Sequence, residues 1–410
     1  MTDVYIVGIG MTAFGRFLDK SVKQLTAEAL EEALEDSGLD RSAIEAAFFA
    51  NTAQGVVEGQ HLVAGQIALR AAGLQGIPVT NVENACATAS TALNAAYAFV
   101  KSGQGEVALA IGAEKMNSED RVRSFAIFDG AWDVHSAEKT ISRLEELAAG
   151  TPRPTGGGSN GKRSVFMDVY AALARYHMHR FGTTREDIAA VSAKNHTHSV
   201  HNPKAQYRTA MTVAEVLSGR EISWPLTLPM CAPISDGAAA AIVCSGEKVR
   251  QLGLGRAVRI AASTIGSGSD REPDDLERHI CRRAAKRAYE IAGLGPSDMN
   301  VAEVHDATAF AEIQQVEALG FCAIGEGGRL AREGETALGG RIPVNPSGGL
   351  ESRGHPIGTT GLAQVYELVT QLRGEAGPRQ VQDARVGIAE NGGGFHGIEE
   401  ATACITILQR

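Results

Sequence analysis

The chain has 410 residues, 44% of them hydrophobic, and a formal net charge of -9 at pH 7. This length and composition allow a large buried core built from two or three domain-sized units. The acidic balance argues against a nucleic-acid-binding protein, which usually carries a basic patch, and no apolar run approaches the ~20 residues needed to cross a bilayer.

The predicted elements alternate between strand and helix from the start of the chain. Residues 4–8 are apolar and strand-like, residues 22–37 have helical periodicity, and residues 46–50 are again strand-like. A helix is predicted over 87–102, followed by a buried strand over 106–112. This alternation predicts an α/β fold with a largely parallel sheet.

The second half of the sequence repeats the first. ALEDSGLDRSAIEAAFF has a later counterpart in AYEIAGLGPSDMNVAEV, each a helix end, a Gly-Leu turn and a strand. The small-residue helix and strand that end at Glu114 have a counterpart that ends at Glu390. Two matches in the same order predict two homologous halves, 1–250 and 256–410, related by a pseudo-twofold axis, with a period too long for a solenoid.

The halves differ in length because of residues 117–230, which hold Gly- and Pro-rich loops and predicted helices over 165–180 and 185–196. We expect an insertion that covers the core, after which SDGAAAAIVCS, from Ser235, returns to a buried strand. The segment GGGSNGKR, 156–163, nearly fits a phosphate-binding loop. It ends in Arg instead of Ser or Thr and follows no strand, so it is not taken as a nucleotide site.

The cysteines and histidines show no spacing typical of a metal site. Six cysteines occur without a CxxC pair, so neither zinc nor a disulfide framework is predicted. The histidines of the insertion are scattered without a clear metal pattern. No secretory signal opens the sequence, and a reducing cytoplasm is the expected location. In that setting one thiol could be a nucleophile.

Cys86 is the first candidate for chemistry. It lies in VENACATASTAL, between a predicted strand and a predicted helix. Free N–H groups and the positive end of the helix dipole there favour the thiolate, which is the nucleophilic form. A buried structural cysteine explains the local sequence equally well.

Two histidines lie in segments that hold a side chain in a defined direction. His355, in NPSGGLESRGHPIGTTG, is surrounded by Gly and Pro ahead of a helix, near the position that Cys86 occupies in the first half. His305, in VAEVHDATAFAEI, lies at a strand-to-helix junction, where Asp306 could cap the following helix. A surface turn and a partly buried cap are the structural alternatives.

A further segment, IAENGGGFHG, places Gly392, Gly393 and Gly394 directly after a buried strand. Glycines there let backbone N–H groups approach a ligand, as an oxyanion hole requires. A plain tight turn is the alternative.

Taken together and in this order, NACATAS, HDATAF, NPSGGLESRGHPIGTTG and ENGGG resemble the thiolase superfamily over essentially the whole chain. HDATAF is similar to the motif of sterol-carrier-protein-type and archaeal thiolases. The resemblance implies two duplicated βαβαβαββ halves in five α-β-α-β-α layers, with the insertion as the loop domain that covers CoA. It implies a homodimer or larger oligomer, CoA as a substrate and no further cofactor. Some archaeal-type relatives also bind a small zinc-ribbon/OB-fold protein, so such a partner is possible.

The resemblance also assigns roles to residues. Cys86 would be the acylated nucleophile, His355 would take its proton, and His305 would polarise the thioester oxygen. The backbone N–H groups of Cys86 and Gly392, with His305, would form the oxyanion holes. The substrate-binding set would be Gly348, Gly349, Gly393, Gly394, Phe166 and Met167. Phe128, Trp132 and Tyr170 are further possible lining residues, although core packing explains all of these aromatic residues equally well.

The sequence departs from classical thiolases at Glu390 and Asn391. Classical members carry a cysteine in Cys-x-Gly-x-Gly that moves the proton at C2, and Glu390 stands in that place. One possibility is an acid/base role, because burial raises a carboxyl pKa. The other is a structural role like that of Glu114, with His355 or water moving the proton. Asn391 is kept as a candidate beside it.

The predicted activity is acyl transfer between a 3-oxoacyl-CoA and CoA through a thioester on Cys86. It would run as thiolysis, in a degradation resembling β-oxidation, or as the reverse Claisen condensation. One alternative is a decarboxylating condensing enzyme, since ketoacyl synthases share a Cys-His-His set. Another is a non-catalytic or retro-aldol thiolase-like subunit that works with the small partner protein. The sequence leaves the acyl chain and the direction open.

Overall fold

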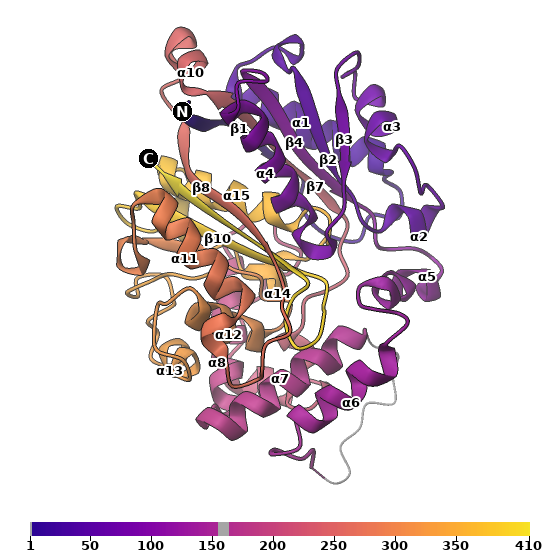
Figure 1. The fold of residues 1–410 in the computed structure, drawn as a ribbon, viewed down its shortest axis with the longest axis vertical. Helices are drawn as coiled ribbons and strands as arrows, with labels where there is room; N and C mark the ends of the chain where they lie inside the picture. The colour runs from indigo at the N-terminus through magenta and orange to yellow at the C-terminus, as the bar shows by residue number, and fades with distance from the viewer. Residues whose placement is uncertain (1, 155–163) are drawn as a thin grey trace.

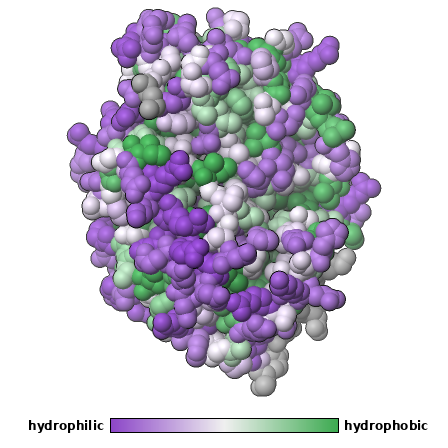
Figure 2. All heavy atoms as spheres, in the orientation of Figure 1, coloured by the Kyte–Doolittle hydropathy of each residue, from purple (hydrophilic) through white to green (hydrophobic). Residues whose placement is uncertain are grey.

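The computed structural model describes residues 2–154 and 164–410. The Gly-rich segment 156–163 lies outside the described residues. Among the described residues, no helix is long and apolar enough to cross a membrane. The face shown in Figure 2 is largely hydrophilic, with apolar residues in smaller patches.

One nine-stranded sheet runs through both halves of the molecule (Figure 1). The N-terminal half of the sheet has the order β3-β2-β4-β7-β1, and its strands are β1 (Val4–Met11), β2 (Ala46–Ala50), β3 (Val79–Val82), β4 (Val107–Glu114) and β7 (Gly237–Ser245). The C-terminal half continues as β8-β11-β10-β9, with β8 (Val258–Ser267), β9 (Val301–Glu303), β10 (Val386–Gly393) and β11 (Thr402–Gln409). The halves join where Tyr5 and Ile6 of β1 pair with β8.

The halves of the sheet repeat one topology, as the sequence duplication predicts. Each half contains a parallel pair of inner strands, β2 with β4 and β9 with β10, and the next strand is antiparallel to them. The counterpart of β3 in the C-terminal half is reduced to a single parallel bridge between Ala302 and Val344.

The expectation of a largely parallel sheet was wrong. Only β2–β3, β2–β4 and β9–β10 are parallel among the described pairs of this sheet. The reason is that the last strands of the two halves, β7 and β11, run antiparallel to their neighbours on both sides. Thus β11 follows β10 through a loop that reverses the chain, and β7 runs antiparallel to both β4 and β1.

Helices complete the five layers (Figure 1). Helices α1 (Val22–Ser37) and α3 (Ala64–Ala71) cover the outer face of the N-terminal half, and α11 (Ile280–Ala292), with α12 (Ala309–Ala318) beside it, covers the C-terminal half. Between the halves lie α4 (Thr88–Lys101) and α15 (Thr360–Arg373), which both contact strands of each half. The predicted α-β-α-β-α arrangement is confirmed.

The central position of α4 explains its composition. Ala89, Ala92 and Ala96 are fully buried, because a helix packed between the two halves of the sheet needs short side chains on several faces. The helix also carries Ser90, whose hydroxyl donates a hydrogen bond to Asn391 Oδ1 at 2.8 Å. Helix α4 is thereby linked to the end of β10, which is where the candidate catalytic segments meet.

The insertion forms the lower region of the molecule in Figure 1. Its helices are α5 (Arg121–Ala126), α6 (Ala137–Leu147), α7 (Val165–Phe181), α8 (Arg185–Ser199) and α9 (Val213–Ser218), followed by the hairpin β5 (Glu221–Ser223) and β6 (Leu226–Thr227). Its apolar core is shared with Phe310 and Ile313 of α12, so the insertion packs on the C-terminal half. The remaining short helices are α2 (Gln54–Glu58), α10 (Gly246–Leu252), α13 (Gly327–Arg332) and α14 (Gly349–Arg353).

Candidate active site

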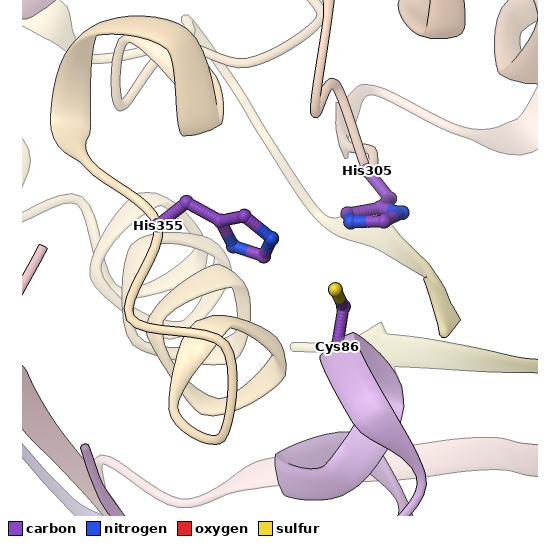
Figure 3. A group of neighbouring side chains, drawn as sticks. All are labelled: Cys86, His305 and His355. Atoms are coloured by element: carbon purple, nitrogen blue, oxygen red, sulfur yellow. The ribbon is translucent and has the colours of Figure 1, made fainter. Parts of the chain in front are cut away.

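Three side chains predicted from separate motifs meet at one point. The Sγ atom of Cys86 and a ring nitrogen from each of His305 and His355 all lie within 4.8 Å of one another. Figure 3 shows the thiol directed toward the space between the two rings. Cys86 lies in the 3-10 turn Ala85–Ala87 ahead of α4, His355 lies in the loop before α15, and His305 lies between β9 and α12.

A constrained backbone holds Cys86 in place. Ala85 has a φ of 49°, a left-handed conformation that is uncommon for a residue with a side chain and is often found at functional sites. The carboxylate of Glu83 accepts the N–H of Ala85 at 2.6 Å, and the hydroxyl of Thr88 donates to the Ala85 carbonyl. These bonds fix the turn from which the thiol projects.

The Cys86 thiol is protonated in the resting protein. Burial raises its pKa to about 12, and the backbone N–H of Gly394 lowers the pKa only partly. The expectation that the helix end favours a thiolate was therefore wrong, because desolvation of the sulfur outweighs the helix dipole. A base must remove the proton when substrate binds.

His355 is oriented to be that base. Its Nδ1 lies 2.6 Å from Thr360 Oγ1, and the Thr360 hydroxyl donates its own proton to the Pro356 carbonyl at 3.1 Å. Thr360 therefore accepts from Nδ1–H, which leaves the lone pair on Nε2. Burial, then the neighbouring His305 and Arg353, lower the pKa of His355 well below 6.5. The ring is neutral at physiological pH and can accept a proton.

His305 is neutral as well, and both of its ring nitrogens lack a partner among the described residues. Burial lowers its pKa to about 4, and its ring centroid lies 5.3 Å from that of His355. A buried ring nitrogen without a hydrogen bond is costly. Such a group, facing a nucleophile, can donate a hydrogen bond to a ligand oxygen.

Asp306 does not cap the helix that follows it, and that expectation was wrong. Thr308 is the N-cap of α12. Asp306 instead accepts the N–H of Leu350 at 2.7 Å and an N–H of Asn195 at 3.1 Å, so it anchors the start of α14. The sequence could not show this contact, because it joins segments that lie far apart along the chain.

The glycines before His355 and the glycines after β10 make different contacts. Gly348 (φ 102°) and Gly349 (φ 61°) are packed so closely on Ser199 and Asp306 that neither leaves room for a Cβ. Neither lines the cavity beside Cys86. These two glycines therefore allow the loop before His355 to sit against the core, and their assignment to substrate binding remains a prediction.

In the loop after β10, the structure brings the N–H of Gly394 to the Cys86 thiol. A Cβ on Gly392 would lie 2.7 Å from Glu400 Cγ and 3.2 Å from His305 Nδ1, so Gly392 lies behind the His305 ring. Gly393 packs on the turn that carries Cys86. The sequence did not single out the N–H of Gly394 as the neighbour of the thiol, because a run of three glycines carries no signal that separates them. The assignment of Gly392 to the oxyanion hole stays a prediction.

Glu390 is fully buried, and both of its carboxylate oxygens are engaged. One accepts the backbone N–H of His305 at 2.9 Å, and the other accepts the Cys281 thiol at 3.4 Å. Burial raises its pKa to about 8. In the other half, Glu114 accepts the N–H groups of Thr52 and Ala53, which follow β2 as His305 follows β9. Glu390 thus makes the contacts of a structural residue.

A cavity of about 870 Å³ opens beside the three side chains. Its wall includes Cys86, His305, His355 and Gly394, together with Phe128, Phe166, Met167 and Tyr170 from the insertion. Trp132 does not belong to the lining. Three arginines that form no ion pair with any described residue, Arg16, Arg121 and Arg220, also line it. The space suits a long, partly apolar ligand that carries negative charge.

A second buried group of possible metal ligands lies in the C-terminal half. His279, Cys281 and Glu400 offer ligand atoms within 4.8 Å of one another. His279 Nδ1 already accepts the N–H of Cys281 at 3.3 Å, and Glu400 accepts an N–H of Gln315 at 2.9 Å. The protein groups already bond to one another here, and the absence of a metal remains a prediction.

Comparison with known proteins identifies the family. Residues 4–214 match the model described as the thiolase N-terminal domain, and residues 263–410 match the thiolase C-terminal domain-like model. The chain belongs to the thiolase family. It is 39% identical to acetyl-CoA acetyltransferase of Methanothermobacter thermautotrophicus over the whole of both chains. It is 35% identical to benzoylsuccinyl-CoA thiolase subunit BbsB of Thauera aromatica, over 92% of this chain and 91% of that one.

Solved structures share the thiolase fold. An Ltp2–ChsH2(DUF35) aldolase matches with a TM-score of 0.75 and 24% identity, over 98% of this chain and 97% of that one. The Acat5 thiolase from Ascaris suum, in complex with coenzyme A, matches with a TM-score of 0.69 and 17% identity over the full length of both chains. At these identities the likeness shows the fold alone.

Proposed function

We propose that the chain is an acyltransferase that cleaves 3-oxoacyl-CoA esters with CoA, through a thioester on Cys86. The proposal rests on one observation. The Cys86 thiol meets the neutral, buried imidazoles of His305 and His355 at the wall of one cavity. The relatives named as an acetyltransferase and a thiolase act on CoA esters, which agrees with this chemistry.

In the first step, His355 Nε2 takes the proton of Cys86, and the sulfur attacks C3 of the substrate. The N–H groups of Cys86 and Gly394 face the thiol and would hold the oxyanion that forms on C3. These N–H groups would lower the activation barrier, because they stabilise negative charge that appears only in the transition state. Gly394 takes the place that the resemblance gave to Gly392.

His305 would hold the oxygen of the leaving thioester. Cleavage of the C2–C3 bond puts negative charge on that oxygen as the enolate forms, and the free ring nitrogens of His305 lie beside Cys86. Its neutral form has one N–H to donate. Glu390 fixes the backbone of His305, so we assign it a positioning role. Asn391 holds β10 against α4.

The arginines at the cavity would bind the polyanionic end of CoA. Arg16, Arg121 and Arg220 are exposed and carry no ion pair with described residues, and arginine suits phosphate because its planar fork can bind two oxygens at once. The apolar wall would then take the pantetheine and acyl chain. No other cofactor is invoked, and a homodimer, a cytoplasmic location and a small zinc-ribbon/OB-fold partner stay predictions.

The proposal is tested by incubating the protein with CoA and a panel of 3-oxoacyl-CoA esters, and identifying the products by mass spectrometry. Two acyl-CoA products, lost in Cys86→Ala, are expected. Cleavage of a 3-hydroxyacyl-CoA that persists in Cys86→Ala would instead indicate retro-aldol chemistry. Release of CO2 from malonyl-CoA would indicate a decarboxylating condensing enzyme.

A further inference from the structure

Tyr170 is a cavity residue to which the proposed acyl transfer gives no role. It lies on α7 of the insertion, is only 7% exposed, and lines the same cavity as Cys86 and His305. A buried tyrosine hydroxyl usually has a hydrogen-bond partner. No described residue bonds to the hydroxyl of Tyr170. The hydroxyl is therefore free to bond to a molecule bound in the cavity.

The hydroxyl lies within electrostatic range of the nucleophile. Burial raises the pKa of Tyr170 well above 10, and the charges of Glu400, Cys86 and Glu390 raise it further. The phenol is therefore protonated at physiological pH. A protonated phenol in a cavity can donate a proton but cannot remove one.

The proposed thiolysis still lacks a proton donor. When the C2–C3 bond breaks, C2 of the leaving acyl-CoA needs a proton, and the position of the classical cysteine holds Glu390. Both oxygens of Glu390 are already engaged, and it does not line the cavity. The donor should therefore come from the cavity wall.

The described wall offers few other thiols or phenols. The Cys231 thiol donates to the Thr227 carbonyl at 3.4 Å, and burial, followed by the charge of Glu351, raises its pKa. Tyr207 is 45% exposed, so water can bond to its hydroxyl. Of these groups, Tyr170 combines burial, a free hydroxyl and proximity to Cys86.

We propose that Tyr170 is a catalytic residue that protonates C2 of the leaving acyl-CoA. This inference rests on the proposed thiolase reaction. Cys86 gives its proton to His355 and attacks C3, and the electron pair of the broken C2–C3 bond stays on C2. The Tyr170 O–H gives its proton to C2, which forms the new C–H bond and leaves a phenolate opposite the protonated His355.

The second half of the reaction restores both groups. The protonated His355 first returns its proton to the Tyr170 phenolate through water in the cavity. The thiol of the incoming CoA then gives its proton to His355 as its sulfur attacks the acyl-Cys86 thioester, and Cys86 leaves as a thiolate and takes that proton back from His355. Protons and charges balance, and no oxidant, reductant or further reactant is needed.

The test compares two reactions of Tyr170→Phe, which keeps the ring and loses only the hydroxyl. The first is cleavage of the 3-oxoacyl-CoA that the wild-type chain cleaves fastest, which needs a proton at C2. The second is exchange of the acetyl group between acetyl-CoA and pantetheine, which uses Cys86 and His355 but no proton at C2. We expect cleavage to fall about 100-fold or more and exchange to change less than about threefold.

Tyr176→Phe is the matched control, because Tyr176 lies on the same helix but its hydroxyl bonds to Asp274 and it does not line this cavity. Both reactions should stay normal in this variant. Equal losses of cleavage and exchange in Tyr170→Phe would make Tyr170 a packing residue and overturn the inference.

Selective loss of cleavage in Cys231→Ala or Glu390→Gln, with normal cleavage in Tyr170→Phe, would assign the proton to that group instead. Failure of the wild-type chain to carry out either reaction would refute the thiolase reaction itself. That outcome differs from failure of the Tyr170 proposal, in which the wild-type chain carries out both reactions.

Discussion

The hydroxyl of Thr360 should set the rate at which Cys86 is acylated. Thr360→Val keeps the shape of the side chain but removes the oxygen that lies 2.6 Å from His355 Nδ1. The buried Nδ1–H then has no partner, which favours the tautomer with the proton on Nε2. Nε2 is the atom that must accept the proton of Cys86, so this tautomer cannot act as the base. The loss of one such bond costs about 1–3 kcal/mol, which corresponds to roughly 5- to 150-fold in rate.

The assay is quenched-flow mass spectrometry of the acylated protein. Thr360→Val should acylate more slowly by that factor, and Thr360→Ser should recover most of the rate. Thr359→Val is the control, because Thr359 is equally buried but its hydroxyl bonds to the Gly237 carbonyl. An acylation rate in Thr360→Val equal to that of Thr359→Val would refute the assignment of the His355 tautomer.

Three further predictions follow from the contacts around His305. Glu390→Gln should leave thiolysis within about threefold of the wild-type rate, because the amide oxygen can still accept the backbone N–H of His305. A large loss confined to thiolysis would show that Glu390 moves the C2 proton. Gly392→Ala should destabilise the fold by about 1–3 kcal/mol, because its Cβ would press on Glu400 and His305. Gly266→Ala on β8 is the control, because a Cβ there meets only ordinary contacts. Equal urea midpoints for the two variants would contradict the packing argument. The pKa of His305 is about 4 in the folded state and 6.5 ordinarily, so the unfolded state binds the extra proton below pH 6.5. The free energy of unfolding should therefore fall by roughly 3 kcal/mol for this group as the pH drops from about 6.5 to 4. Urea unfolding across this pH range measures it, and an equally steep fall in His305→Asn would refute the prediction.

The sequence predicted the elements with local signals. Helix α1 has the predicted bounds, 22–37, because Ser21 caps its start and Gly38 ends it in the left-handed conformation. The repeat of helix, Gly-Leu turn and strand predicted the two halves. Strands β1 and β4 extend beyond their predicted ends, to Met11 and Glu114, since pairing with neighbouring strands decides where a strand stops.

The sequence could not give the features that depend on contacts between distant segments. The motifs predicted Cys86, His305 and His355 as a group through their resemblance to the thiolase superfamily. The pKa of Cys86 depends on how much apolar structure surrounds the sulfur, and no local pattern reports that. The sequence could not predict the contacts of Asp306 or the contact of the Gly394 N–H with the Cys86 thiol, because these also join distant segments.

The role of Thr360 shows the same limit at short range. Thr360 stands five residues after His355 in a segment of Gly, Pro and Thr, where Thr359 is an equally good candidate. Only the folded loop decides which hydroxyl meets the ring.

The covalent thioester on Cys86 is the central claim, and one measurement tests it most directly. The intact protein is mixed with the 3-oxoacyl-CoA esters, quenched, weighed by mass spectrometry and digested to locate any adduct. A mass gain of one acyl group on Cys86, discharged by added CoA and absent in Cys86→Ala, is the predicted result. Turnover of a 3-oxoacyl-CoA without any adduct on Cys86, or with an adduct on another residue, would contradict the account.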